Sequence, residues 1–332
     1  MKEQYPARLE LFADNAQRIK KAFPWQNAMV NRLAALLYAV EDKVADDEAI
    51  RASYELIKES TGIFSQFRGA SVISIAALLS LSDEKETLLA NTFAVYDLMK
   101  EAKFRASDYL VVAAYQIAAN ATSDRYQRTV ERAKLFYDSM KAKHRFLTGQ
   151  DDYIFSAMLG LSDIDVESGV DRMEQLYVTL KPEFMSGNSV QALTQVLVLG
   201  EEAPQAADRV LALRDAFRAQ GIRLDKEYTL SSLGVLSLLP CNKEDIVTDV
   251  SETYEFLRTK KGFGNWSIGK QELLLLSSAL VAFRSVEDVQ NGVLTTMLST
   301  NITNIVIAQQ AALAGAAAAS AAAAAAAASS SN

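Results

Sequence analysis

The stretch 109–119, YLVVAAYQIAA, followed by 123–141, SDRYQRTVERAKLFYDSMK, decides the fold. The first part carries no charge and is richer in Ala and Leu than strands usually are, so it predicts a short helix buried on nearly every side. The second part opens with Ser and Asp, which cap helix starts, and repeats apolar residues on one face. Together they predict a helical hairpin with one core helix and one amphipathic helix.

The same register recurs six times at intervals of 37 to 42 residues. Each copy closes on a basic residue: Lys58, Lys100, Lys141, Lys181, Arg218 and Arg258. Such a period is typical of stacked helical hairpins, because one hairpin cannot bury its apolar face alone. We therefore predict an all-α array of about seven helical hairpins, either α-solenoid-like or an α/α superhelix.

This pattern also predicts where the elements lie. The uncharged stretches should begin helices near 71, 109, 153, 189, 228 and 273, after an earlier copy at 29–40. Helix should exceed about 65% of the residues, with strand essentially absent. We divide the chain into an N-terminal capping helix in 1–26, a hairpin domain in 27–305 and an Ala/Ser-rich low-complexity tail in 306–332.

Composition narrows the classes of function. Of 332 residues, 50% are hydrophobic and 23% are charged, which is typical of a globular chain, and the net charge is −7. This acidity argues against nucleic acid as a partner. The single cysteine, Cys241, forbids an intrachain disulfide and a cysteine metal cluster. No apolar run is long enough for a membrane span, and no secretory signal opens the chain, so we expect a cytoplasmic protein.

The connections between hairpins hold the first candidate binding residues. A large apolar residue usually follows each closing basic residue, and we interpret these as plugs beneath the next hairpin: Phe64, Phe104, Phe146, Phe184, Ile222 and Phe263. The connection 259–270 is the longest, and Phe263 and Trp266 make it the best candidate for a functional loop. If it is functional, Trp266 should be partly exposed. Within it, GNWSIGK has phosphate-loop spacing, but Gln271 replaces the hydroxyl residue and no strand precedes it.

Acidic and histidine residues suggest little chemistry. Asp163, Asp165, Glu167, Asp171 and Glu174 follow calcium-loop spacing, but Ser168 stands where that loop needs glycine, and a capped helix start explains the same acids. His144 is the only histidine, and we expect it at the end of a helix. The sequence offers weak metal candidates in Asp163, Asp165, Glu167 and Glu174, no catalytic residue and no cofactor.

Three tyrosines, Tyr109, Tyr153 and Tyr228, open core helices in three copies of the register. Equivalent positions in a hairpin array line up on one face, so these side chains could form a recognition ladder. They could equally pack in the core with each hydroxyl at a helix end, and we favour packing.

Several segments resemble a family of uncharacterised, mostly Gram-positive bacterial proteins, domain of unknown function 4003. The likeness lies in the opening LFADNAQRIKKAF, in FGNWSIGKQELLLLS and in the Ala-Ser-rich end after IVIAQQAA. The resemblance implies a cytoplasmic helical protein. It transfers no activity, ligand or site residue.

Two functions remain open. The first is a non-enzymatic scaffold that binds a protein or peptide on the extended face of the array. The alternative is an enzyme in which the hairpins close into an α/α toroid and use carboxylates at the rim, such as Asp46–Asp47 and Asp151–Asp152. Contact between the first and last hairpins around an acid-lined cavity would favour the enzyme.

Overall fold

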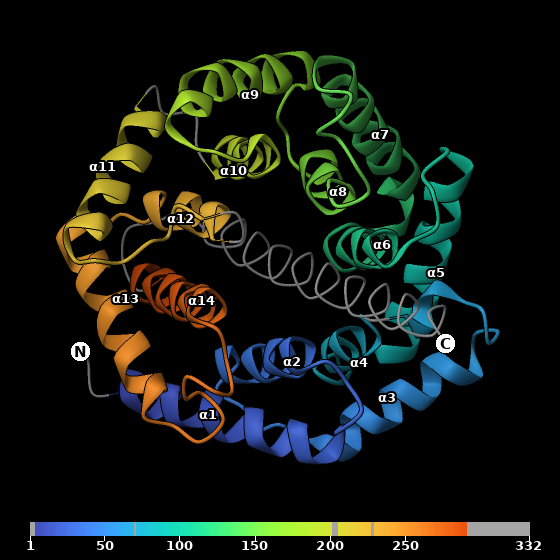
Figure 1. The fold of residues 1–332 in the computed structure, drawn as a ribbon. Coiled ribbons are helices and arrows are strands. Elements are labelled where there is room, and N and C mark those ends of the chain that lie inside the picture. The colour runs from blue at the N-terminus through green and yellow to red at the C-terminus, as the bar shows by residue number, and fades with distance from the viewer. Residues whose placement is uncertain (1–3, 70, 201–204, 227–228, 291–332) are drawn as a thin grey trace, which may run out of the picture.

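The protein is built from helices arranged in two concentric layers (Figure 1). The structure, a computed structural model, describes residues 4–69, 71–200, 205–226 and 229–290. Of these residues, 74% are helical and none forms a strand, so the all-α prediction is confirmed. None of the described helices is both long and apolar enough to cross a membrane.

The two layers alternate along the chain, each outer helix being followed by an inner one. The outer helices are α1 (Gln4–Ala22), α3 (Asp47–Glu59), α5 (Lys85–Glu101), α7 (Tyr126–Lys143), α9 (Val166–Leu180), α11 (Ala206–Ala219) and α13 (Lys243–Arg258). The inner helices are α2 (Ala28–Val40), α4 (Val72–Ser80), α6 (Asp108–Asn120), α8 (Tyr153–Leu161), α10 (Gly187–Gly200), α12 (Leu230–Ser237) and α14 (Lys270–Gln290). Short 3₁₀ turns lie at Gln66–Arg68 (η1), Ser123–Arg125 (η2) and Lys181–Glu183 (η3).

Hydrophobic pattern assigns each helix to its layer. The uncharged stretches became the inner helices, and in α6 every residue from Leu110 to Ala118 is buried. The amphipathic stretches became the outer helices, which bury one face and expose the other. The six expected starts agree with the observed ones to within three residues, from Val72 in α4 to Lys270 in α14.

The first and last helix pairs contact each other, so the ends of the array meet. α1 lies against α13 and α2 against α14. The Tyr5 hydroxyl is 2.8 Å from Thr253 Oγ1, the Phe12 and Phe263 rings are 5.4 Å apart, and Arg32 Nη1 forms a 2.5 Å ion pair with Glu272. We call these contacts the seam. The helix expected to cap the array is thus an outer helix at the seam, and the proposed tail, 306–332, lies outside the described residues.

The six expected plugs have different outcomes. Phe104, Phe184 and Phe263 are buried, as predicted, and Ile222 is half-buried against the core. Phe64 and Phe146 are 91% and 98% exposed, so this prediction was wrong for both. Phe67 takes the core position in place of Phe64, with its ring 4.7 Å from that of Phe93, and half-buried Leu147 follows exposed Phe146.

Candidate functional site

The two faces of the ring differ in charge because the outer helices all run in the same direction. Acidic residues stand in the first turns of α3, α5, α9, α11 and α13, where they complement the positive end of the helix dipole. Basic residues stand in the last turns of α1, α3, α5, α7, α11 and α13. These six outer helices therefore contribute positive charge to the same face of the ring.

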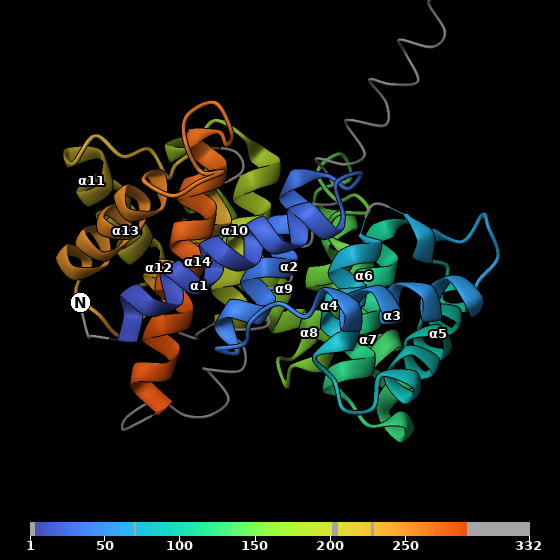
Figure 2. The same cartoon turned by 90° about the horizontal axis from the view of Figure 1, so that it is seen from below.

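That face is formed by the connections from outer to inner helices, and we call it the loop face (Figure 2). Its described residues are 23–27, 60–69, 102–107, 144–152, 181–186, 220–226 and 259–269. In Figure 2 these connections lie along the upper side of the ring, opposite the connections from inner to outer helices.

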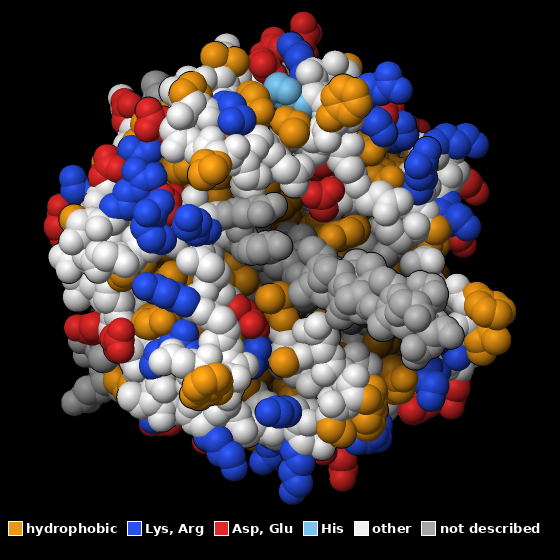
Figure 3. Space-filling view, viewed as in Figure 1, with side chains coloured by type: hydrophobic (Ala, Val, Ile, Leu, Met, Phe, Trp, Pro, Cys, Tyr) orange, Lys and Arg blue, Asp and Glu red, His pale blue; other side chains and the backbone are white. Residues whose placement is uncertain are grey.

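The loop face exposes large apolar side chains. Phe64, Phe146, Met185 and Trp266 are each exposed by 91% or more, and Trp25 and Ile63 by 60% and 73%. The other exposed large apolar side chains of the described residues are Val44, Leu135 and Val178, at 56–64%. Figure 3 looks onto this face and shows hydrophobic side chains standing apart around the ring, with Lys and Arg between them.

Five of these connections contain both a large apolar residue that packs inward and one that is exposed. The residues turned inward are Phe23, Phe67, Leu147, Phe184 and Phe263, of which Leu147 is half-buried and the others fully buried. The residues turned outward in the same connections are Trp25, Phe64, Phe146, Met185 and Trp266. Packing of the next hairpin is satisfied by the inward residue, so the outward one is not explained by the fold.

Hydrogen bonds from two arginine side chains anchor the connection that carries Trp266. Arg258 Nη1 donates to the carbonyls of Phe263 and Ile268, at 2.9 and 3.1 Å. Arg32 Nη2 donates to Ser267 O at 2.8 Å, across the seam. Trp266 is thus presented on an anchored loop and is fully exposed, which a functional loop requires and a core plug excludes.

A glycine fixes the entry to the same loop. Gly262 has a φ of +83°, a conformation that side chains with a Cβ rarely adopt. A Cβ there would also lie 2.3 Å from Nε2 of Gln17, which donates to Lys261 O at 2.7 Å. Any larger residue would disturb both the turn and the contact with α1.

Basic side chains flank the exposed apolar ones. Lys20 and Lys21 end α1 just before Trp25, and Lys261 and Lys270 stand on either side of Trp266. All four are exposed. The connections at the seam, 23–27 and 259–269, contain no acidic residue. The loop face is therefore both apolar and cationic where α1 meets α13.

The remaining predicted binding residues lie in or near the core. Phe263 is fully buried and packs on Phe12, so it stabilises the seam and offers no surface to a partner. Tyr153 is 2% exposed, its ring is 4.9 Å from that of Phe104, and its hydroxyl accepts a 3.2 Å hydrogen bond from Arg105 N. Tyr109 is half-buried, while Tyr228 lies outside the described residues. For Tyr153, packing is the role that the structure shows.

The weak calcium candidates have structural roles or stand apart. Asp165 caps α9 by accepting a 3.0 Å hydrogen bond from Ser168 N, and Glu174 Oε2 lies 2.8 Å from His144 Nε2. Asp163 and Glu167 are exposed. In the described part of the chain, no three acidic, histidine or cysteine side chains are grouped as a metal ion would need.

Asp152, which the sequence suggested only as a rim acid of the enzyme alternative, is a buried carboxylate between α8 and α10. Asp152 is 5% exposed, and its carboxylate accepts hydrogen bonds from Gln195 Nε2 at 2.6 Å, Gln191 Nε2 at 3.1 Å and Gly149 N at 2.8 Å. Burial, and after it the charge of Asp151, raises the pKa of Asp152 to about 6. A signal was present, because Gln191 and Gln195 stand four residues apart in the otherwise apolar stretch 189–199.

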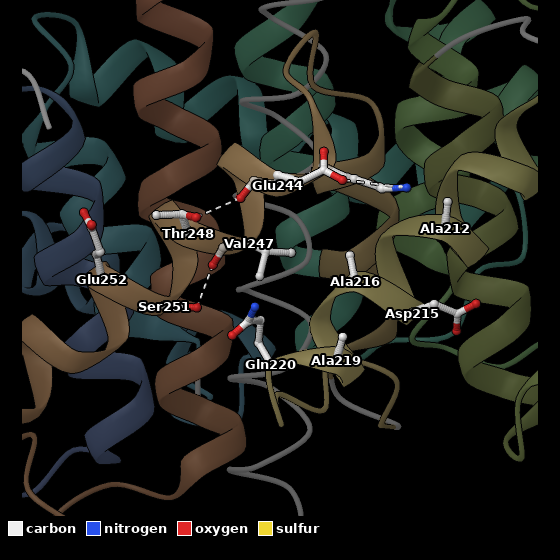
Figure 4. Close-up of a pocket in the computed structure, with 11 residues that line it drawn as sticks. Ala212, Asp215, Ala216, Ala219, Gln220, Glu244, Val247, Thr248, Ser251 and Glu252 are labelled. Atoms are coloured by element: carbon white, nitrogen blue, oxygen red, sulfur yellow. Dashed lines mark hydrogen bonds and ion pairs between the residues drawn. The ribbon is translucent and has the colours of Figure 1, made fainter.

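A groove runs along the outer wall between α11 and α13 (Figure 4). It encloses about 720 Å³ and is lined by small side chains such as Ala212 and Ala216. Its hydroxyl groups bond to the helix itself, since Thr248 donates to Glu244 O and Ser251 to Val247 O. These groups are not arranged around a shared point, so the groove shows no constellation for chemistry.

Two residue combinations weighed from the sequence lie far apart. The acid pair Asp46–Asp47 begins outer helix α3, whereas Asp151–Asp152 precedes inner helix α8, so the pairs lie on opposite faces of the ring. Cys241 lies between α12 and α13, on the face opposite His144. The GNWSIGK segment joins helices α13 and α14, without the strand that a phosphate loop follows.

Comparison with known proteins gives one match. The sequence model of a family described as "Protein of unknown function (DUF4003)" matches residues 15–311. This covers most of the chain and confirms the resemblance seen in its sequence. No curated protein and no solved structure matches significantly.

Proposed function

Because the chain belongs to the DUF4003 family, whose description assigns no activity, we propose its role from its surface: it is a non-enzymatic docking protein, and its loop face binds a partner that presents negative charge. The sequence favours a scaffold of about seven hairpins that binds a protein or peptide, and we assign its binding role to the loop face.

The observation that carries this proposal is that five connections expose a large apolar residue beside another that already packs inward. Trp25, Phe64, Phe146, Met185 and Trp266 are exposed although a neighbour in each connection already fills the core position. Aromatic residues and methionine, the types found at these five positions, are enriched at interaction surfaces. Selection for folding alone would favour polar residues at these positions, because they cost nothing in packing and improve solubility.

The enzyme alternative requires a closed ring and carboxylates grouped at one rim. The ring is present, but the proposed carboxylates are not grouped. The seam closes the array, as an α/α toroid would. However, the acid pairs proposed for its rim are on opposite faces. Asp46 accepts from Ala49 N as a helix cap, and Asp152 is buried under three hydrogen bonds. These carboxylates are engaged in structure, so docking is the better supported function.

Photo-crosslinking in cells that make the protein tests the proposal. A photoreactive phenylalanine analogue replaces Phe64, Phe146 or Trp266 on the loop face. The matched positions are Leu135 and Val178 on the outer wall, which are also exposed and apolar. We expect adducts from the loop face and few from the wall.

The opposite pattern contradicts docking through the loop face. Adducts that form equally at all five positions, or only at Leu135 and Val178, would mean that this face has no partner. Adducts confined to the loop face would support the proposal whether the captured molecule is protein or lipid.

A further inference from the structure

We infer that the partner of the loop face is the surface of an anionic lipid bilayer, to which the ring attaches without crossing it. This inference rests on the proposed function and names its partner. It follows from three properties of the loop face: the separation of its apolar side chains, their chemical types and the charge around them.

The apolar side chains of the loop face are separate from one another. A side chain exposed by 96% or 98%, as Met185 and Phe146 are, has almost no contact with any neighbour. These residues therefore do not combine into one continuous patch, and Figure 3 shows hydrophobic side chains spaced around the ring. A protein partner would need a separate pocket for each of them, at matching positions. A fluid bilayer accepts each one independently and needs no shape complementarity.

The residue types fit the boundary between lipid and water. Both tryptophans of the chain, Trp25 and Trp266, are exposed on this face, together with Phe64 and Phe146. Aromatic side chains are enriched at the level of lipid headgroups, because a flat apolar ring with a polar edge suits that region. All these residues are on connections at the same side of the ring, so they can reach one planar surface together.

The charge on this face selects an anionic surface. The chain as a whole carries −7, which would repel it from anionic lipids. The seam region of the loop face carries exposed Lys20, Lys21, Lys261 and Lys270 beside the two tryptophans. Each such residue close to an anionic bilayer strengthens binding by roughly fivefold, provided that the face is turned toward the lipid.

Vesicle binding of the full-length chain tests the inference. Flotation is measured with vesicles of phosphatidylcholine alone and with vesicles that also contain phosphatidylglycerol. We expect binding only to the anionic vesicles, and a loss of binding as salt is raised, because salt screens the attraction. Both tryptophans should enter the lipid headgroup region when the loop face binds. Their fluorescence should therefore shift to the blue and be quenched by brominated lipids.

Matched variants assign the binding to the loop face. Phe146→Ala with Trp266→Ala should weaken binding by at least tenfold, whereas Leu135→Ala with Val178→Ala on the wall should leave it unchanged. The triple variant Lys20→Glu, Lys21→Glu, Lys261→Glu should weaken binding on the order of 100-fold. Its control, Lys85→Glu, Arg125→Glu, Lys243→Glu, changes the net charge equally but lies at the starts of outer helices on the other face.

Each outcome has a distinct meaning. No binding to anionic vesicles at low salt, or binding that the wall variants weaken as much as the loop-face variants, overturns the lipid inference. If crosslinking from the loop face captures a protein and vesicles do not bind, the docking function stands and the lipid partner is wrong. If neither probe involves the loop face, both proposals fail together.

Discussion

At the scale of the residue, neighbouring apolar side chains in one connection have opposite roles. Phe263 is buried in the core at the seam, while Trp266, three positions later, is fully exposed. The sequence pointed to both as candidates for binding, and it could not separate them because both follow the same basic anchor in a glycine-rich segment. Hydrogen bonds from the Arg258 and Arg32 side chains to backbone carbonyls of this connection hold the backbone that turns Phe263 inward and Trp266 outward.

Unfolding measurements on two alanine variants check this division of roles. Phe263→Ala should lower the free energy of unfolding by about 3–5 kcal/mol, because it leaves a cavity in the core. Trp266→Ala should change it by less than about 0.5 kcal/mol, because the indole has no packing to lose. A large loss in Trp266→Ala would mean that the tryptophan is a core residue and would remove it from the loop-face surface.

The buried carboxylate of Asp152 predicts a dependence of stability on pH. Its pKa is raised from 3.8 to about 6 in the folded protein, so the folded state holds the proton more tightly than the unfolded state. The stabilisation is complete below pH 3.8 and is lost as the pH rises through about 6. Relative to Asp152→Asn, the wild type should lose about 3 kcal/mol across this window.

Denaturant unfolding of both proteins at several pH values gives the comparison. Asp151→Asn is the control, because its carboxylate is less buried and acts on Asp152 only through its charge. It should retain most of the wild-type pH dependence. Parallel curves for the wild type and Asp152→Asn would show that the carboxyl does not hold its proton on folding.

At the scale of the element, the inner and outer helices could be predicted and the seam could not. Uncharged stretches such as 109–119 must be buried on all sides, which places them in the inner layer whatever the global shape. Closure depends instead on small rotations that accumulate from hairpin to hairpin. Tyr5 and Thr253, joined by a hydrogen bond, are 248 positions apart, and no local pattern connects them. The exposed apolar side chains of the loop face could not be predicted for a related reason. Sequence spacing shows which positions are apolar, but not whether each side chain points into the core or toward solvent.

Core substitutions in the outer helices test whether the seam is packed as well as the rest of the ring. Phe12 in α1, Phe136 in α7 and Phe217 in α11 are all fully buried. Phe12→Ala should therefore cost about 3–5 kcal/mol, the same as Phe136→Ala and Phe217→Ala. Equilibrium unfolding of the three variants under identical conditions measures this. A much smaller cost for Phe12→Ala would indicate that the ends of the array separate in solution.

At the scale of the whole molecule, the direction of the outer helices creates an uneven charge distribution. Six of the seven outer helices gather bases at the last turn and five gather acids at the first, and the ring adds these contributions on opposite faces. Net charge alone, at −7, describes a uniformly acidic protein. The arrangement instead gives one face on which the attraction of anions can exceed the average repulsion.

Ion exchange chromatography measures this polarity without any biological partner. At pH 7 and low salt, the protein should be retained by a cation exchanger despite its net negative charge. Retention should vanish in the Lys20→Glu, Lys21→Glu, Lys261→Glu variant and persist in the Lys85→Glu, Arg125→Glu, Lys243→Glu variant. Equal elution of the two variants would show that net charge, and not its distribution, governs binding.

The seam also has a consequence for the order in which the ring assembles and opens. Contacts between adjacent hairpins join residues such as Tyr38 and Ser80, 42 positions apart, whereas Lys260 meets Glu10 across 250 positions. Contacts of such long range require most of the chain to be ordered beforehand, so the seam should form after the folding transition state. Phe12→Ala should then accelerate unfolding and leave the folding rate nearly unchanged, in contrast to Phe136→Ala. Loss of the seam contacts should therefore control the rate of unfolding, so the seam sets the lifetime of the folded state.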